Sequence, residues 1–154
     1  MIFNIVSVSK KPKDIFQTLI SEYEKRIAHP NIINWIFINP ANINQKTENK
    51  KLLEAENTLK HIPKNSYVIS LDEGGKQLSS VDLSKSIETI NQSFNEITFI
   101  IGGADGLHEN IIKTSNAVIS LSSLTLPHQL VKIFLVEQIY RAILISKNHP
   151  YHRE

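Results

Sequence analysis

The sequence predicts one α/β domain over residues 1–154, with a mainly parallel sheet and flanking helices. Short β-branched or apolar segments alternate with longer segments whose apolar residues recur at helical spacing, as in βαβ units. The length of 154 residues is usual for a single domain. A content of 41% hydrophobic and 21% charged residues is typical of a globular protein and argues against a disordered one.

Five short segments predict strands, because they are rich in β-branched and apolar residues and end at turn-forming ones. They are residues 2–8, 32–38, 67–71, 97–101 and 117–121. The third is broken by Asp72-Glu-Gly-Gly-Lys76. The fourth and fifth are nearly all apolar, as expected of strands buried on both faces of a parallel sheet.

Five helices are predicted between and after these strands. The first starts at Asp14, where Gln17 completes a capping box, and stops before His29-Pro30. The second, residues 47–62, is charged and has a thin apolar stripe of Leu52, Leu53, Ala55 and Leu59. The third opens at another capping box, Ser79–Asp82, and carries Leu83, Ile87, Ile90 and Phe94 on one face. The last two cover residues 109–114 and 129–146.

Composition excludes several classes of chemistry and location. The chain has no cysteine, which excludes disulfides, cysteine-bound zinc and thiol nucleophiles. The apolar N-terminus is short and is followed, not preceded, by lysines, unlike a signal peptide. No stretch reaches the roughly 18 apolar residues that a membrane span needs. We therefore expect a cytoplasmic protein without membrane association.

Basic residues gather in the first part of the chain although the net charge is only +2. Residues 1–64 hold ten Lys/Arg against six Asp/Glu, and residues 65–154 hold seven against nine. Clusters such as Lys10/Lys11/Lys13 could contact the phosphates of a nucleic acid. They could equally be the solvated faces of helices and loops.

Three loops that follow predicted strands carry the candidate binding residues, because open α/β sheets bind ligands beyond the carboxyl ends of their strands. The loops begin at Leu71, Gly102 and Leu121. Gly102, Gly103 and Gly106 are three of five glycines in the chain, and they would let the backbone approach a ligand closely. A plain strand-to-helix turn would also use them. Their G-G-x-x-G spacing does not match a dinucleotide fingerprint, and there is no Walker A motif.

The segment from Ser122 to His128 mixes apolar and hydroxyl residues, and could present backbone groups to a flat heterocycle or simply lead into a helix. The C-terminal tail concentrates Asn148, His149, Tyr151, His152 and Arg153. Arginine can pair with phosphate, tyrosine can stack on a base, and histidine can move protons near neutral pH. A metal site at two imidazoles without a third ligand is weak, and a disordered polar tail is the other reading.

Four segments taken together resemble one known family. They are Gly102-Gly-Ala-Asp-Gly-Leu107, Leu121-Ser-Ser-Leu-Thr-Leu-Pro-His128, Glu137-Gln-Ile-Tyr-Arg-Ala142 and Asn148-His-Pro-Tyr-His-Arg-Glu154. In these motifs and in length the chain is similar to the ribosomal RNA large subunit methyltransferase H family, whose members have the SPOUT fold. Residues 10–65 match only in pattern. Ala104-Asp105 stands where Pro-Glu is common, and Ser123 where Ala can stand.

The resemblance implies an α/β sheet whose C-terminal segment forms a deep trefoil knot and binds S-adenosyl-L-methionine. Strand order could not have predicted a knot, because chain connections almost never thread loops. Carried over by position, the cofactor-binding residues are Leu71, Gly102, Leu121, Ser122, Ser123, Leu124, Thr125 and Leu126. Gly103 and Gly106 would shape the same wall.

The resemblance also implies a homodimer, without a metal ion, that methylates N3 of a pseudouridine in 23S rRNA within the large subunit or the whole ribosome. N3 attacks the sulfonium methyl group, S-adenosylhomocysteine leaves, and the N3 proton passes to a base or to water. The candidate catalytic residues are His128, Tyr151, His152 and Arg153. Tyr151 would position the base, Arg153 would stabilise charge or hold phosphate, and the tail of the partner subunit would complete the pocket.

Two other functions remain open from the sequence. A small-molecule α/β enzyme with a nucleotide cofactor would turn over its substrate without RNA. A ribosome-binding module that keeps the cofactor fold without catalysis would bind the cofactor or ribosomes and transfer no methyl group.

Overall fold

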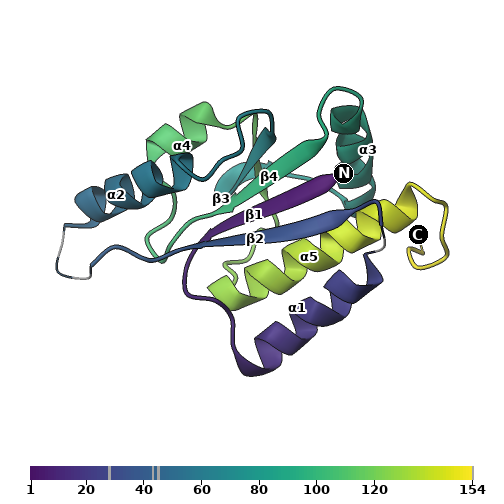
Figure 1. Ribbon diagram of the computed structural model, residues 1–154, viewed down its shortest axis with the longest axis horizontal. Helices are drawn as coiled ribbons and strands as arrows, with labels where there is room; N and C mark the ends of the chain where they lie inside the picture. The colour runs from purple at the N-terminus through teal and green to yellow at the C-terminus, as the bar shows by residue number, and fades with distance from the viewer. Residues whose placement is uncertain (28, 43, 45, 154) are drawn as a thin grey trace.

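In the computed structural model, which describes residues 1–27, 29–42, 44 and 46–153, five parallel strands form a sheet with helices on both faces (Figure 1). The elements in chain order are β1 (Ile2–Val8), α1 (Asp14–Arg26), β2 (Ile32–Ile38), α2 (Thr47–Leu59), β3 (Tyr67–Gln77), α3 (Ser80–Asn91), β4 (Glu96–Ile101), α4 (Glu109–Thr114), β5 (Ala117–Ser120) and α5 (His128–Ile145). The predicted α/β class with a parallel sheet is confirmed.

The strand order β2-β1-β4-β3-β5 puts the carboxyl ends of β4, β3 and β5 side by side. Each neighbouring pair in this sheet is parallel. The loops that follow β4 and β5 therefore meet at one edge of the sheet, beside Leu71 of β3, which pairs with Ile101 and Ile119. The trefoil knot of the C-terminal segment stays a prediction.

Alternate residues of the central strands pack into two separate hydrophobic cores, one on each face of the sheet. Phe99 of β4 packs with α1, α3 and α5 on one face, whereas its neighbour Ile100 packs with α2 and α4 on the other. This alternation follows from the two-residue period of a strand. Figure 1 shows α1 and α5 together beneath the sheet and α2 and α4 above it. Helix α5 contacts both α1 and α3, so it forms the centre of its layer.

The two predicted capping boxes have different outcomes. The second is confirmed: Ser79 precedes α3, and its hydroxyl accepts a hydrogen bond from the backbone N–H of Asp82 at 3.0 Å. The first is wrong, because Lys13 occupies the N-cap position of α1 and makes no side-chain cap. Gln17 instead donates to the Ser21 hydroxyl at 3.1 Å.

The predicted apolar stripe of the second helix is buried only at Ala55 among its four residues. Leu52, Leu53 and Leu59 are exposed, and α2 buries Glu54, Ala55 and Thr58. The reason is a polar tertiary contact, since the Glu54 carboxylate accepts a hydrogen bond from the backbone N–H of Ala41 at 2.9 Å. The helix also ends at Leu59, three residues before the predicted Ile62.

The third strand is longer than predicted, because it continues through Asp72-Glu-Gly-Gly to Gln77 with a register shift against β5. A Cβ at Gly75 would lie 2.5 Å from the backbone of Ile119, so only glycine permits this close pairing. Smaller shifts affect the ends of other elements. Helix α3 finishes at Asn91 and leaves Phe94 outside it, β5 stops at Ser120, and α5 begins at His128.

Candidate functional site

A cavity of about 680 Å³ opens at the sheet edge where β3, β4 and β5 end. Its wall is built from Leu71–Glu73 in the middle of β3, from the loops after β4 and β5 and from the first turn of α5. The volume lies within the range of about 300–1,000 Å³ that is usual for small-molecule and cofactor sites. This cavity is therefore the candidate binding site.

Seven of the eight predicted cofactor-binding residues lie on the cavity wall: Leu71, Gly102, Leu121, Ser122, Leu124, Thr125 and Leu126. Gly103 and Gly106 are wall residues too. Ser123 is exposed and does not belong to the wall. The wall also includes residues that were not predicted, among them Asp72, Glu73, Asp105 and Val131. They follow or face the predicted loops, so extension of each strand-end motif by one or two residues would have found most of them.

Residues 102–106, named here the glycine loop, fold back so that parts of the loop lie close together. A Cβ at Gly102 would lie 2.9 Å from the carbonyl carbon of Gly106, and a Cβ at Gly103 would lie 2.8 Å from the Glu54 carboxylate. Gly106 has a φ of +80°, a conformation that residues with a side chain rarely adopt. Main chain therefore forms much of this wall, with α2 packed behind it.

Side-chain hydrogen bonds shape the loop after β5. The Ser120 hydroxyl donates to the carbonyl oxygen of Ser122 at 2.8 Å, and the Ser122 hydroxyl accepts from the backbone N–H of Leu124 at 2.9 Å. These bonds occupy polar groups within the loop itself. The apolar side chains of Leu121 and Leu126 then contribute to the cavity wall.

His128 connects α5 to the glycine loop. Its Nε2 lies 2.7 Å from the carbonyl oxygen of Gly102, and because a carbonyl can only accept, Nε2 carries the proton. Burial lowers the pKa of the His128 imidazole below its usual value, although the hydrogen bond to Gly102 opposes this change. The imidazole is therefore neutral near pH 7, and Nδ1 is its one basic nitrogen.

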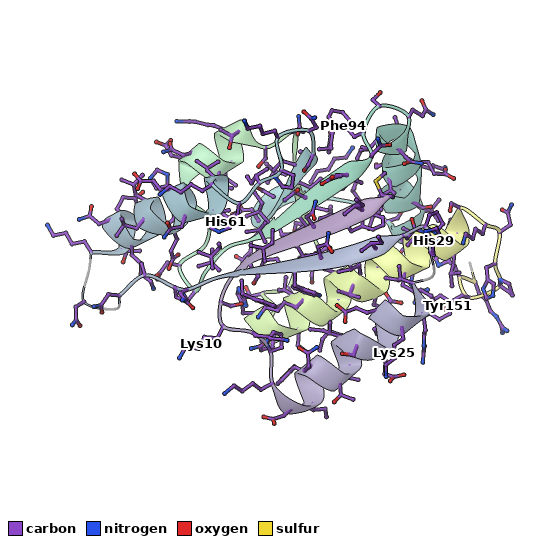
Figure 2. The ribbon with its side chains drawn as sticks, viewed as in Figure 1. Lys10, Lys25, His29, His61, Phe94 and Tyr151 are labelled. Atoms are coloured by element: carbon purple, nitrogen blue, oxygen red, sulfur yellow. The ribbon has the colours of Figure 1, made fainter. Side chains whose placement is uncertain are left out.

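The tail packs on the other end of α5. Figure 2 shows Tyr151 where α1 and α5 both finish, and its hydroxyl donates to the Glu137 carboxylate at 3.2 Å. The Arg141 guanidinium lies 4.7 Å from the centre of the Tyr151 ring and pairs with Glu137 at 2.5 Å. It also donates to Nδ1 of His152 at 3.3 Å. These four residues form one cluster, named here the tail cluster.

Tyr151 is a neutral hydrogen-bond donor in this cluster. Burial, together with the negative charge of Glu137, raises the pKa of Tyr151 to about 12. The sequence predicted roles for Tyr151 and His152 but none for Glu137 and Arg141. Their i, i+4 spacing in a largely apolar helix was the available indication.

The structure does not bring the four predicted catalytic residues together within one chain. His128 and Arg141 are separated by about 20 Å along α5, at 1.5 Å of rise per residue. His128 lies on the cavity wall, whereas Tyr151 and His152 lie in the tail cluster. Arg153 is exposed, and Glu154, the last residue of the predicted tail, lies outside the described residues.

The described part of the chain contains no group of three or more His, Cys, Asp or Glu side chains placed to hold a metal ion. Among the same residues, no helix has both the length and the apolar character to cross a membrane.

The chain is similar to known proteins both in sequence and in fold. A family model described as "Predicted SPOUT methyltransferase" matches residues 1–152. Ribosomal RNA large subunit methyltransferase H of Halothermothrix orenii is 40% identical, over 99% of this chain and 100% of its own length. The protein of the same name from Nitrosomonas eutropha is 38% identical, over 99% of both chains. A probable methylase family protein from Haemophilus influenzae has a similar fold, with a TM-score of 0.59 at 11% identity, over 99% of this chain and 70% of that one.

Proposed function

Because the chain belongs to the SPOUT methyltransferase family, we propose that it is an S-adenosylmethionine-dependent enzyme that methylates large-subunit (23S) ribosomal RNA. We assign the reaction to N3 of a pseudouridine. The whole chain, residues 1–154, acts as a single catalytic domain. The observation that carries the proposal is the cavity beside β3, which Leu71–Glu73 and the loops after β4 and β5 line.

The residues of this cavity fit S-adenosylmethionine. The volume of about 680 Å³ accommodates a nucleoside with an amino-acid side arm. Leu71, Leu121 and Leu126 offer apolar surface to an adenine ring, and the glycine loop offers a wall without side chains. When bound, the cofactor supplies an activated methyl group, so the protein chiefly has to align the reacting atoms.

The chain supplies groups for the proton that N3 must lose. The basic Nδ1 of neutral His128 can accept it at the cavity wall. The ring of Tyr151 can position the base, and the cations Arg141 and Arg153 can stabilise the anion that develops. Within one chain these last groups lie too far from the cavity, so the proposal requires a second chain.

We propose a homodimer that forms through α5. Leu130 and Phe134 stand one turn apart on this helix with 44% and 41% of their surface exposed. The tail cluster continues the same helix face toward the C-terminus, because residues 130, 134, 137 and 141 follow the i, i+3/i+4 pattern. A two-fold contact that pairs these helices antiparallel would place the partner's tail beside the cavity of the first chain. Each cavity would then be completed in trans.

Methyl transfer to ribosomes tests this function. Tritium-labelled S-adenosylmethionine, purified protein and ribosomes or large subunits from a strain that lacks the enzyme should give labelled 23S rRNA, with N3-methylpseudouridine after digestion. Free rRNA as a third substrate identifies the assembly state that is recognised. We place the reaction in the cytoplasm, where ribosomes are. Cofactor binding without label in any of the three substrates would contradict the proposal.

A further inference from the structure

The cavity wall carries an excess of negative charge. Its acidic residues are Asp72, Glu73 and Asp105, and its one histidine, His128, is held neutral by burial. Lys50 pairs with Asp105 at 2.6 Å and offsets that carboxylate. In the described part of the chain, Asp72 and Glu73 take part in no ion pair. Two uncompensated carboxylates therefore remain in the middle of β3.

In the part of the chain that the structure describes, neither Lys76, an exposed cation later on β3, nor Lys132 forms an ion pair with these two carboxylates. Lys132 is fully buried one turn beyond His128, and its Nζ donates to the amide oxygen of Gln129 at 3.2 Å. The same Nζ lies 5.9 Å from the centre of the Phe37 ring on β2, the edge strand at the other side of the sheet from β5. The negative electrostatic potential along β3 therefore favours a cation bound in the cavity.

We infer that Asp72 and Glu73 make the cavity prefer the cationic cofactor S-adenosylmethionine over its neutral product S-adenosylhomocysteine. This inference rests on the proposed function. The two molecules share adenine, ribose, ammonium and carboxylate groups, and they differ by one methyl group and the positive charge of the sulfonium. A carboxylate that bonded a shared hydroxyl would hold both equally, whereas an unpaired charge distinguishes them. The functional consequence is release of the product once the methyl group has left.

The local structure of β3 allows a clean test of Asp72. Its Oδ1 accepts a hydrogen bond from the backbone N–H of Gly74 at 2.9 Å. Asp72→Asn keeps an oxygen acceptor for this bond and removes only the charge. Glu73 is exposed, so Glu73→Gln carries little risk for the fold. Glu56→Gln, an exposed residue of α2 outside the cavity wall, makes the same change in net charge and serves as the control.

Calorimetry should measure the dissociation constants of both ligands for the wild-type protein and the three variants. We expect Asp72→Asn and Glu73→Gln each to weaken the binding of S-adenosylmethionine by about three- to tenfold. The binding of S-adenosylhomocysteine should weaken by less than about twofold. The double variant should change the ratio further, and the control should leave it unchanged. Raising the salt from about 0.05 to 0.5 M should reduce the wild-type preference, because salt screens charges.

Two results would overturn the inference while leaving the proposed function in place. One is an equal loss of affinity for both ligands in the variants, which would mean that the carboxylates bond a group that both ligands share. The other is an unchanged ratio in the double variant. If the wild-type protein binds neither ligand, the proposed function itself is wrong and the inference is lost with it.

Discussion

His128 and His152 lie at opposite ends of α5: the first lies on the cavity wall, and the second contacts Arg141 near the end of the helix. One straight helix therefore joins the cofactor cavity to the tail cluster and keeps them apart. In a pair of antiparallel helices related by a two-fold axis, the same separation would bring the cavity of each chain to the tail of the other.

Association through α5 is testable by placing a charge on its exposed apolar face. Phe134→Asp should convert the dimer to a monomer at micromolar concentration, because a buried unpaired carboxylate at the contact is costly. Light scattering measures the mass. Leu53→Asp is the matched control, since Leu53 is exposed to a similar degree (40% against 41%) on α2, in the other helical layer. A wild-type protein that already has the mass of a monomer would contradict the proposed dimer.

Removal of residues 151–154 should abolish methyl transfer and leave the cofactor cavity intact. The tail contacts α5 about 20 Å from His128, so affinity for the cofactor should change by less than about tenfold, or ~1.4 kcal/mol. Arg153→Ala alone should already reduce activity, because a charge-assisted contact contributes roughly 1.5–3 kcal/mol. Lys147→Ala, at an exposed position before the tail, is the control. Full activity in the truncated protein would remove the tail from the site.

A mixed dimer tests whether the tail acts in trans. One chain carries Gly102→Val and the other lacks residues 151–154, so only a trans arrangement leaves one complete site. We expect activity near half that of the wild-type dimer. An inactive mixed dimer, with each altered chain still active beside a wild-type chain, would show that the tail acts within its own chain.

Gly102→Val should disrupt the glycine loop. A Cβ here would press on the backbone of Gly106 and on the Leu107 side chain at 2.9–3.0 Å, so we expect destabilisation of about 1–3 kcal/mol and at least about tenfold weaker cofactor binding. Gly106→Ala is the comparison, because its Cβ would enter open space and cost only about 1–2 kcal/mol for the positive φ. Calorimetry and urea unfolding measure both effects. Wild-type affinity in a folded Gly102→Val protein would exclude Gly102 from the site.

Burial of His128 should make stability depend on pH. Its pKa is lowered in the folded protein, whereas the unfolded chain has the ordinary value of about 6.5. Between these two values the unfolded state binds more protons, so the free energy of unfolding should fall as pH drops below about 6.5. Urea unfolding at several pH values should show a shallower dependence in His128→Gln than in wild type.

The lysines after β1 should contribute to RNA binding. Lys10, Lys11 and Lys13 are exposed, and Figure 2 places Lys10 at the end of the molecule where α5 begins, the end that contains the cavity. Replacing all three with alanine should weaken binding to ribosomal RNA and lower the slope of log affinity against log salt by about 2–3. Replacing Lys60, Lys64 and Lys85 is the charge-matched control. Equal slopes in both triple variants would assign the contacts elsewhere.

The sequence by itself determined the elements whose residues act locally. The bounds of β1 and β2 follow from segments rich in β-branched and apolar residues. The start of α3 follows from the hydroxyl of Ser79, three residues from the N–H that it caps. Most of the cavity wall could also be located, because parallel strands deliver their carboxyl-end loops to one edge of the sheet.

Contacts between residues that are distant in the sequence decided which face of α2 is buried, how far β3 extends and where the tail packs. α2 buries Glu54 in place of its leucines because Ala41, thirteen positions away, offers a backbone N–H. β3 runs past Leu71 because Gly75 fits against Ile119 on β5. The tail is held at the far end of α5 because Arg141 and Glu137 bond Tyr151 and His152 there. The spacing of apolar residues shows which face of a helix or strand is apolar. Which residues that face contacts depends on how the whole chain packs.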